Sequence, residues 1–174
     1  MNLHGSNILG AELSAAGDTT FFAINPISGE ALPANFHEAT PAEASRALEI
    51  AEEAFCAYRL CPPTAIAKFL DAAASALEDA GDRLIERAHA ETALPQTRLI
   101  SERSRTTAQL RMFSALIREG SWVDARIDRA DPKRQPLPKP DLRRMLLPIG
   151  PVVVFGASNF PLAFSVCEIG RAHV

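Results

Sequence analysis

The sequence has few cysteines and histidines, and both residue types are widely spaced. Its 174 residues include three cysteines, at Cys56, Cys61 and Cys167, and four histidines. No two cysteines have CxxC spacing, and no cysteine and histidine together have the spacing of a zinc site. The chain is therefore not expected to be a disulfide-rich scaffold or a metal-binding module. Cys56 falls on the apolar stripe of an expected helix and is interpreted as a small core residue.

The sequence also lacks a concentrated charge of one sign and a long apolar run. It has 18 Lys and Arg against 21 Asp and Glu, and aromatic residues make up only 6%. The basic residues are spread along the chain without interleaved aromatics, so we expect no nucleic-acid partner. No apolar run approaches the roughly 18 residues of a membrane span. The first 20 residues also lack the basic region and apolar core of a signal peptide. We expect no membrane association and a cytoplasmic location.

Turn-forming and helix-capping residues predict a strand and then a helix near the N-terminus. The apolar residues 21–24 are followed by the turn sequence "NPISGE", which predicts a short strand and a turn. Thr40 is expected to be the N-cap of a helix, with Pro41 at its first position and Glu43 completing a capping box. The helix should pack on another element, because its apolar residues recur at spacings of three and four. They are Ala44, Ala47, Leu48, Ala51, Ala54, Phe55 and Tyr58.

Two further helices are expected between residues 64 and 95. Thr64 follows two prolines and is the predicted cap of the first of them, which Gly81 is placed to end. Asp82 is expected to begin the next helix, which ends near Pro95.

A fourth amphipathic helix is predicted from about Thr97 to Glu119, with Gly120 as its stop. One face is expected to carry Leu99, Arg103, Thr106, Leu110, Phe113 and Ile117. Charged residues of this helix line either a site or a solvated face, and the second interpretation is favoured because charged side chains are seldom buried. They are Glu102, Arg103, Arg105 and Arg111.

The composition changes after residue 125. Residues 126–148 contain five prolines and seven Lys or Arg, so their first part is predicted to be an extended, exposed arm. The closing "LRRMLLP" is predicted to be a strand. Edge strands of this kind make contacts between subunits, although a simple linker is equally consistent with the sequence.

Residues 152–155, "VVVF", are the continuous apolar run expected of a parallel core strand covered on both faces. Residues 156–159 then form a tight turn, and Pro161 stands where the first turn of a helix tolerates proline. A strand, a turn and a helix in this order place a ligand at the carboxyl end of an α/β sheet. Many such turns carry an asparagine only for local hydrogen bonding, so a ligand site and a purely local turn both remain open.

The sequence resembles the N-terminal part of the aldehyde dehydrogenase superfamily over about residues 20–166. The resemblance is carried by "NPISGE", the Ala-rich helices, "REGSWVDARID" and "PLPKPDLRRMLLPIGPVVVFGASNFPLAFSV", in this order. The form "FGASNFPLAFS" is most similar to the branch of α-ketoglutaric semialdehyde (2,5-dioxovalerate) dehydrogenases. Ser158 replaces the tryptophan of the family's usual "PWNFP". The resemblance implies an α/β fold, with this chain as the helical layer and first core strand of a truncated Rossmann-like cofactor domain.

The resemblance also implies a division of the chain and a homo-oligomeric parent protein. The expected segments are 1–125, strands and helices of the cofactor-binding domain; 126–148, an oligomerisation arm and strand; 149–167, the first Rossmann-like strand and turn; and 168–174, a tail outside the fold.

The resemblance also implies which residues contact the substrate and the cofactor, where positions of this sequence match the family motif. Asn159 matches the asparagine whose side-chain amide donates to the oxygen of the aldehyde substrate. Phe155, Gly156, Ala157 and Ser158 match the segment along the nicotinamide end of NAD or NADP. A thiolate that adds to an aldehyde creates an alkoxide, and a fixed amide donor stabilises that charge. No metal is expected.

The resemblance implies that other parts of the site lie beyond the matched stretch. These are the nucleophilic cysteine, the glutamate that activates water and the groups that hold the adenosine ribose; Cys56, Cys61 and Cys167 stand in the wrong sequence context. The tail "EIGRAHV", Glu168 to Val174, resembles the translation of a sequencing adapter and is expected to be an artefact. We therefore expect a truncated chain that is inactive by itself.

Two other hypotheses belong to different classes. One is a small non-catalytic assembly module that binds full-length subunits, and the other is an unrelated helical protein with one strand. Because the expected Val-rich strand lacks neighbours, the isolated chain is also predicted to be unstable or prone to aggregate.

Overall fold

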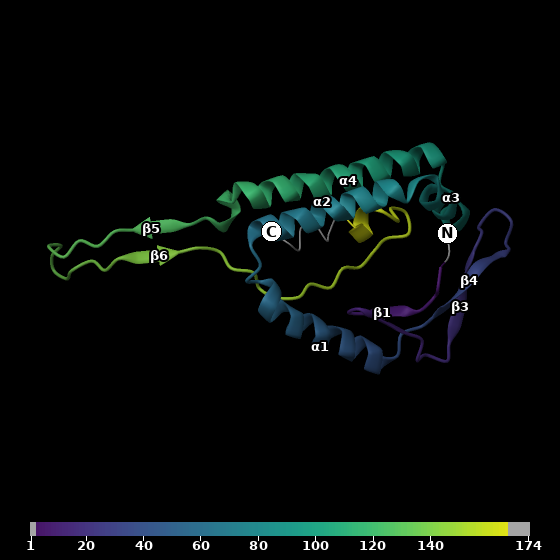
Figure 1. The fold of residues 1–174 in the computed structure, drawn as a ribbon, viewed down its shortest axis with the longest axis horizontal. Coiled ribbons are helices and arrows are strands. Elements are labelled where there is room, and N and C mark those ends of the chain that lie inside the picture. Colours follow the sequence, from purple (N-terminus) through teal and green to yellow (C-terminus); the bar gives the residue numbers. More distant parts are fainter. Residues whose placement is uncertain (1–2, 167–174) are drawn as a thin grey trace.

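The computed structural model describes residues 3–166, which begin with two antiparallel β-hairpins (Figure 1). In the first, β1 (Asn7–Leu9) pairs with β2 (Glu12–Ser14). In the second, β3 (Thr20–Ile24) pairs with β4 (Ala31–His37). The predicted strand at residues 21–24 is confirmed, whereas β4 was not anticipated.

The turn between β3 and β4 is closed by the side chain of Asn25. Its Oδ1 accepts hydrogen bonds from the backbone N–H groups of Ile27 at 2.9 Å and Ser28 at 3.3 Å. A short side-chain acceptor followed by proline and glycine is the chemistry that turns a chain back on itself. The predicted turn is therefore present.

The capping box of α1 (Pro41–Tyr58) forms as predicted. Thr40 Oγ1 accepts from the Glu43 N–H at 3.1 Å, and Glu43 Oε2 accepts from the Thr40 N–H at 2.8 Å. Glu43 also accepts from the backbone N–H of Ala16 at 3.4 Å, which joins the helix to the segment after β2. One glutamate thus fixes both the start of α1 and its attachment to the N-terminal hairpins.

The apolar face of α1 is largely uncovered by the described residues. Leu48 is 56% exposed, and Cys56, predicted to be a core residue, is exposed. The helix packs against β1 near its start, and Figure 1 shows its remaining length standing apart from the other helices. The core prediction for Cys56 was wrong because helical periodicity identifies an apolar face but not whether anything covers it.

The core lies between α2 (Pro63–Asp79) and α4 (Gln96–Glu119), which run side by side (Figure 1). Its buried residues are Ala67, Leu70, Ala74, Leu110, Phe113 and Ile117. A second, smaller cluster holds α3 (Gly81–Thr92) to the start of α4 through Ile85, Ala88 and Leu99. Small alanines on α2 let the two long helices approach closely over several turns.

The boundaries of α2 and α3 differ slightly from the prediction. The N-cap of α2 is Pro62, not Thr64, because proline is well accommodated at the first helical position. Gly81 ends α2 as predicted: it follows the C-cap Ala80, and its φ of 58° turns the chain there, so that it is also the first residue of α3. Gly120 does end α4 as predicted, in a left-handed conformation with φ 84°.

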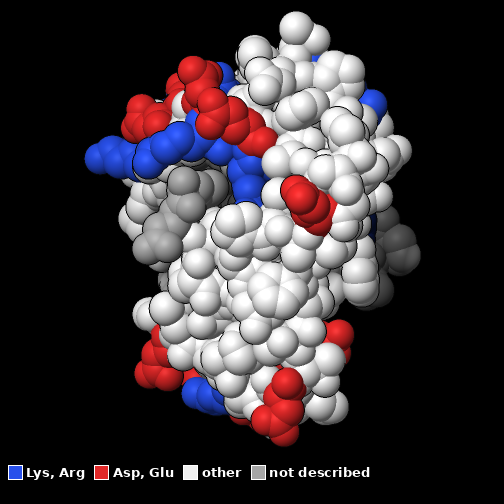
Figure 2. Space-filling model, turned by 90° about the vertical axis from the view of Figure 1, so that its right-hand side faces the viewer, with Lys and Arg blue, Asp and Glu red and all other residues white. Residues whose placement is uncertain are grey.

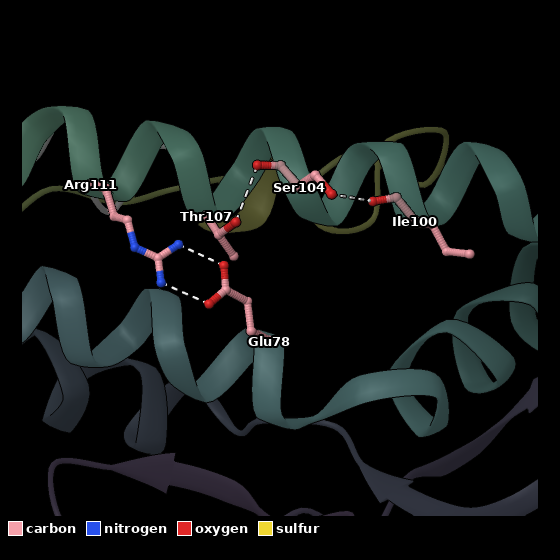
Figure 3. A network of polar contacts seen from close by, with 5 residues as sticks. All are labelled: Glu78, Ile100, Ser104, Thr107 and Arg111. Carbon is pink, nitrogen blue, oxygen red and sulfur yellow. Dashed lines mark hydrogen bonds and ion pairs between the residues drawn. The ribbon is translucent and has the colours of Figure 1, made fainter.

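Ion pairs across the outer surface reinforce the contact between α2 and α4. Arg111 makes a bidentate pair with Glu78 at 2.6 and 2.7 Å (Figure 3), and this lowers the pKa of Glu78. Along α4 in the same view, Thr107 Oγ1 donates to the carbonyl of Ser104 at 3.1 Å. The predicted solvated face of α4 is therefore correct for Arg111, which is exposed and paired.

A proline-rich hairpin projects away from the helices (Figure 1). It follows a short 3-10 helix, η1 (Ser121–Val123), and is formed by β5 (Arg126–Asp128) and β6 (Leu142–Arg144), which pair antiparallel. All six strand residues are exposed. The predicted exposed arm is confirmed, and the predicted strand is shorter than "LRRMLLP".

The predicted core strand at residues 152–155 does not form. The segment is extended but belongs to no sheet, and Val152 and Val153 are 55% and 62% exposed. A strand needs a neighbour to accept and donate its ladder hydrogen bonds, and none lies beside this segment within residues 3–166. The prediction was wrong because a continuous apolar run indicates a preference for strand but does not provide the neighbouring strand.

One face of the molecule is shown in Figure 2. Acidic and basic side chains gather toward two ends of this face, often side by side, and a broad uncharged area lies between them. Within residues 3–166, none of the helices combines the length and the apolar composition of a membrane-spanning segment.

Candidate functional site

The predicted turn after residue 155 is present and carries Asn159 at its exposed tip. The Phe160 N–H donates to the Ala157 carbonyl at 3.1 Å, which closes the turn over Ser158 and Asn159. Both of these residues are exposed. The chain then becomes helical over residues 163–166, as the position of Pro161 predicted.

Glu102 of α4 caps this helical segment from within the protein. Its Oε1 accepts hydrogen bonds from the backbone N–H groups of Leu162 and Ala163, both at 2.9 Å. Pro161 has no N–H, so these are the first free donors of the segment, and at a helix start they have no partner along the chain. Glu102 is only 6% exposed, so its assignment to a solvated helix face was wrong. A buried carboxylate is accommodated here because the two amides compensate it.

Arg98, one helical turn before Glu102, contacts the turn at Asn159 itself. Its Nη2 donates to the Asn159 carbonyl oxygen at 2.6 Å, and its guanidinium carbon lies 4.9 Å from the centroid of the Phe160 ring. A guanidinium in this position combines a charge-assisted hydrogen bond with a cation–π contact. Arg98 was not among the site residues predicted from the sequence.

A signal for these two residues was present in the sequence. Glu102 lies between Leu99 and Thr106 at the spacing of the buried face of α4, and residues four apart on a helix point the same way. A charged residue in the middle of an apolar stripe indicates a buried partner. The identity of that partner, 60 positions later, cannot be inferred from helical spacing.

The segment after the turn is anchored in the core. Leu162 and Ala163 are 7% and 3% exposed, and Val166 packs against the cluster between α2 and α4. The Phe160 and Phe164 rings meet edge to face with centroids 5.0 Å apart. The turn is therefore fixed to the rigid helical layer although its tip faces solvent.

The remaining predicted site residues, 155–158, directly precede Asn159 and carry no charged side chain. Phe155 is 87% exposed, Gly156 and Ser158 are exposed, and Ala157 is half-buried. A Cβ on Gly156 would lie 2.6 Å from Ser165 Oγ, so the backbone passes close to the following segment there. These four residues and Asn159 are consecutive in the chain and form one continuous strip.

The described residues contain no group of histidines, cysteines and carboxylates that could hold a metal ion. Cys56 is exposed on α1, and Cys61 lies just after that helix, where its thiol contacts the Ala57 carbonyl at 3.9 Å. Cys167 and the predicted tail Glu168–Val174 lie outside the described residues.

A groove of about 560 Å³ lies between α1 and the extended segment that leads to the turn. Its lining includes Phe55 and Tyr58 from α1, Trp122 from η1, and Leu147 and Val152 from the segment. The uncovered face of α1 and the unpaired apolar segment therefore face each other across a shared apolar groove.

Comparison with known proteins gives consistent matches along the chain. The family model described as "Aldehyde dehydrogenase family" matches residues 13–174. Alpha-ketoglutaric semialdehyde dehydrogenase 2 of Azospirillum brasilense is 52% identical over 167 residues, which are 95% of this chain and 32% of that protein. Alpha-ketoglutaric semialdehyde dehydrogenase of Acinetobacter baylyi is 43% identical over 162 residues, 93% of this chain and 31% of that protein. The chain thus spans about a third of the length of these relatives.

Solved structures share the same fold. A 3,6-anhydro-L-galactose dehydrogenase in complex with NAP superposes with a TM-score of 0.80 at 24% identity, covering 98% of this chain and 34% of that one. An NAD-dependent benzaldehyde dehydrogenase from Corynebacterium glutamicum gives a TM-score of 0.66 at 18% identity, covering 73% of this chain and 27% of that one. The hypothesis of an unrelated helical protein is contradicted by these matches.

Proposed function

The chain belongs to the aldehyde dehydrogenase family, and from that premise we propose that it forms the N-terminal third of a subunit that oxidises an aldehyde to a carboxylic acid. NAD or NADP is the proposed hydride acceptor. The candidate substrate is α-ketoglutaric semialdehyde, because the two curated relatives, 52% and 43% identical, both carry that activity in their names.

The observation that carries the proposal is the exposed Asn159 on a turn whose backbone is fixed. Addition of a thiolate to the aldehyde carbon forms a C–S bond and moves the π electron pair of the carbonyl onto its oxygen. The Asn159 side-chain amide donates a hydrogen bond to that oxygen as its charge develops. A donor held in place before the reaction needs no reorganisation at the moment of bond formation, which is why a rigid turn suits this role.

Phe155, Gly156, Ala157 and Ser158 are proposed to line the nicotinamide end of the cofactor. The strip is uncharged, and it contains two residues with little or no side chain, so a flat ring can approach the backbone. NAD or NADP, when bound, accepts the hydride that leaves the substrate carbon. The nucleophilic thiolate and the residue that activates water for thioester hydrolysis are assigned to the rest of the subunit.

The proposal is tested with a chimera in which the aligned part of this chain replaces its counterpart in the Azospirillum brasilense enzyme. Reduction of NAD and of NADP is followed at 340 nm with α-ketoglutaric semialdehyde and with unrelated aldehydes. We expect activity in the chimera and a loss of about 10²- to 10³-fold in kcat on Asn159→Ala, the effect of removing one oxyanion donor. Asn25→Ala, which removes an amide from the β3–β4 turn, is the matched control and should leave kcat unchanged. A folded chimera without dehydrogenase activity would contradict the proposal.

A second candidate function is assembly, and the projecting β5–β6 hairpin is the observation that favours it. Residues 126–148 expose apolar side chains on a protruding arm, including Ile127 at 64% and Leu142 at 56%. We propose that this arm contacts neighbouring subunits in a homo-oligomer. Ile127→Lys in the chimera should reduce its oligomer mass in sedimentation velocity. If the isolated chain binds full-length subunits while the chimera is inactive, the assembly function replaces the catalytic one.

A further inference from the structure

Glu102 and Arg98 hold the site turn on both sides of its exposed tip. Arg98 binds the carbonyl oxygen of Asn159 at 2.6 Å, and Glu102 binds the N–H groups of Leu162 and Ala163 at 2.9 Å. The three contacts fall within five consecutive residues of the turn. They originate from one rigid helix, α4, which is packed along α2.

We propose that Glu102 and Arg98 are positioning residues that fix the backbone around Asn159 and thereby aim its side-chain amide at the substrate oxygen. This inference rests on the proposed function of Asn159. The physical requirement is strict, because an error of about 1 Å in the placement of a reacting or stabilising group can cost about 10²-fold in rate.

The geometry around Glu102 favours a positioning role over a general stabilising one. Its Oε2 is buried and has no hydrogen-bond partner among the described residues, while Oε1 accepts two bonds. A serine or an aspartate within the turn would cap the same amides locally. Capping from α4 instead ties the turn to a distant, rigid element.

Arg98 contributes a different constraint. Its hydrogen bond acts on the peptide group that follows the Asn159 side chain, and its contact with the Phe160 ring restrains rotation of the next residue. A lysine at this position keeps a donor but lacks the planar guanidinium that reaches the carbonyl and stacks on the ring at the same time. The two helix residues together therefore restrain the position of the turn and its rotation.

The variants of Glu102 test whether loss of the side-chain oxygen that accepts from the turn amides, and not loss of side-chain volume, causes the effect. Glu102→Gln keeps an oxygen that can accept from both amides, whereas Glu102→Ala removes it. Glu78→Ala is the matched control, because it deletes a carboxylate that joins α4 to α2 through Arg111 but does not touch the turn. Arg98→Lys and Arg98→Ala complete the set.

Two measurements are made. The first is amide hydrogen exchange on the 174-residue chain, followed by mass spectrometry of overlapping peptides at low protein concentration so that association of the chain is limited. The exchange of the Leu162 and Ala163 amides should accelerate by at least about 10-fold in Glu102→Ala, because their acceptor is lost, and should stay near wild type in Glu102→Gln and Glu78→Ala. The second measurement determines kcat and KM in the chimera. Glu102→Ala should lower kcat by about 10²-fold with little change in the aldehyde KM. Glu102→Gln should have a kcat close to that of the wild-type chimera.

Arg98→Ala should lower kcat by a smaller factor, and the double variant should lose less than the product of the two single effects, because both residues act on the same turn. Equal kcat values for Glu102→Ala and the wild-type chimera would overturn the inference, as would failure of Glu102→Gln to recover kcat. If the wild-type chimera is inactive, the proposed function fails, and amide exchange alone tests whether Glu102 positions the turn. Faster exchange of the Leu162 and Ala163 amides in Glu102→Ala, but not in the control variants, supports this role. Unchanged exchange of these amides overturns it.

Discussion

Glu43 and Glu102 both accept hydrogen bonds from backbone amides at the start of a helical segment. The partners of Glu43 include the N–H of Thr40, three residues before it, so its role could be predicted from the "TPAE" sequence. The partners of Glu102 lie 60 and 61 residues away, so its role depends on how α4 meets the turn.

The environment of Glu43 predicts a pH-dependent stability. Hydrogen bonds from the Ser14 hydroxyl and the Thr40 backbone N–H lower its pKa from 4.5 to about 2. The unfolded chain therefore binds this proton more readily than the folded chain. The stabilising contribution is complete above the ordinary pKa and is lost as the pH falls from about 4.5 toward 2.

We expect Glu43→Gln to flatten the pH dependence of the urea midpoint in this window. The stability difference between wild type and variant should be larger at pH 6 than at pH 2.5. Glu52→Gln, which changes an exposed glutamate of the same helix, is the control. A pH profile of Glu43→Gln that superimposes on that of wild type would show that Glu43 is not the group responsible.

Gly120 gives a second prediction for a single residue. It ends α4 with a φ of 84°, a region that is unfavourable for residues with a Cβ, and no atom lies within 4 Å of where a Cβ would stand. Gly120→Ala should therefore lower the free energy of unfolding by about 1–2 kcal/mol through backbone strain alone. Gly120→Asn should cost less, because asparagine tolerates this conformation better. Thermal unfolding of the three proteins provides the measurement.

At the scale of elements, α1 and α4 show what an apolar stripe does and does not predict. Both have the expected periodicity and form the expected helices. The stripe of α4 is buried against α2, whereas much of the corresponding face of α1 lines an open groove. Periodicity predicts which side of a helix is available for packing, and the rest of the fold decides whether that side is covered.

The contact between α2 and α4 should therefore dominate stability. Leu110 is fully buried at its centre, so Leu110→Ala is expected to cost about 2–5 kcal/mol, from the lost burial and the cavity left behind. Ile100→Ala on the same helix removes a side chain that is 43% exposed and should cost much less. Urea denaturation of both variants measures the difference. Similar losses for the two would mean that the helical layer is not the main source of stability.

At the scale of the whole molecule, the segment before the site turn presents unusually exposed apolar side chains. Ile149 is 97% exposed and Val153 is 62% exposed, on an extended backbone that pairs with no strand of residues 3–166. Unpaired, apolar, extended segments are templates for association with another chain. The prediction that the isolated chain aggregates therefore rests on this segment.

We expect the isolated chain to associate in a concentration-dependent manner, measured by sedimentation velocity. Replacing Ile149 and Val153 with lysine should reduce this association without lowering the thermal midpoint, because neither side chain is buried. Lysines at Ser45 and Ala57, exposed positions of α1, provide a control with the same added charge. If the control suppresses association equally, net charge and not this segment governs it.

The sequence by itself determined the features that depend on residues close together in the chain. These include the capping box of α1, the glycine stop of α4, the exposed proline-rich arm and the turn that carries Asn159. Each follows from backbone geometry or from a side chain that bonds its own neighbours. The family resemblance, carried by consecutive residues, was also available from the sequence and is confirmed.

Only the tertiary structure decided the features that need two distant segments. It placed Glu102 under Leu162 and Ala163, it left Cys56 and the apolar face of α1 uncovered, and it left residues 152–155 without a sheet. Burial, strand pairing and long-range capping each require a partner whose position local sequence does not encode. For this reason a charged residue expected to face solvent became the buried anchor of the candidate site.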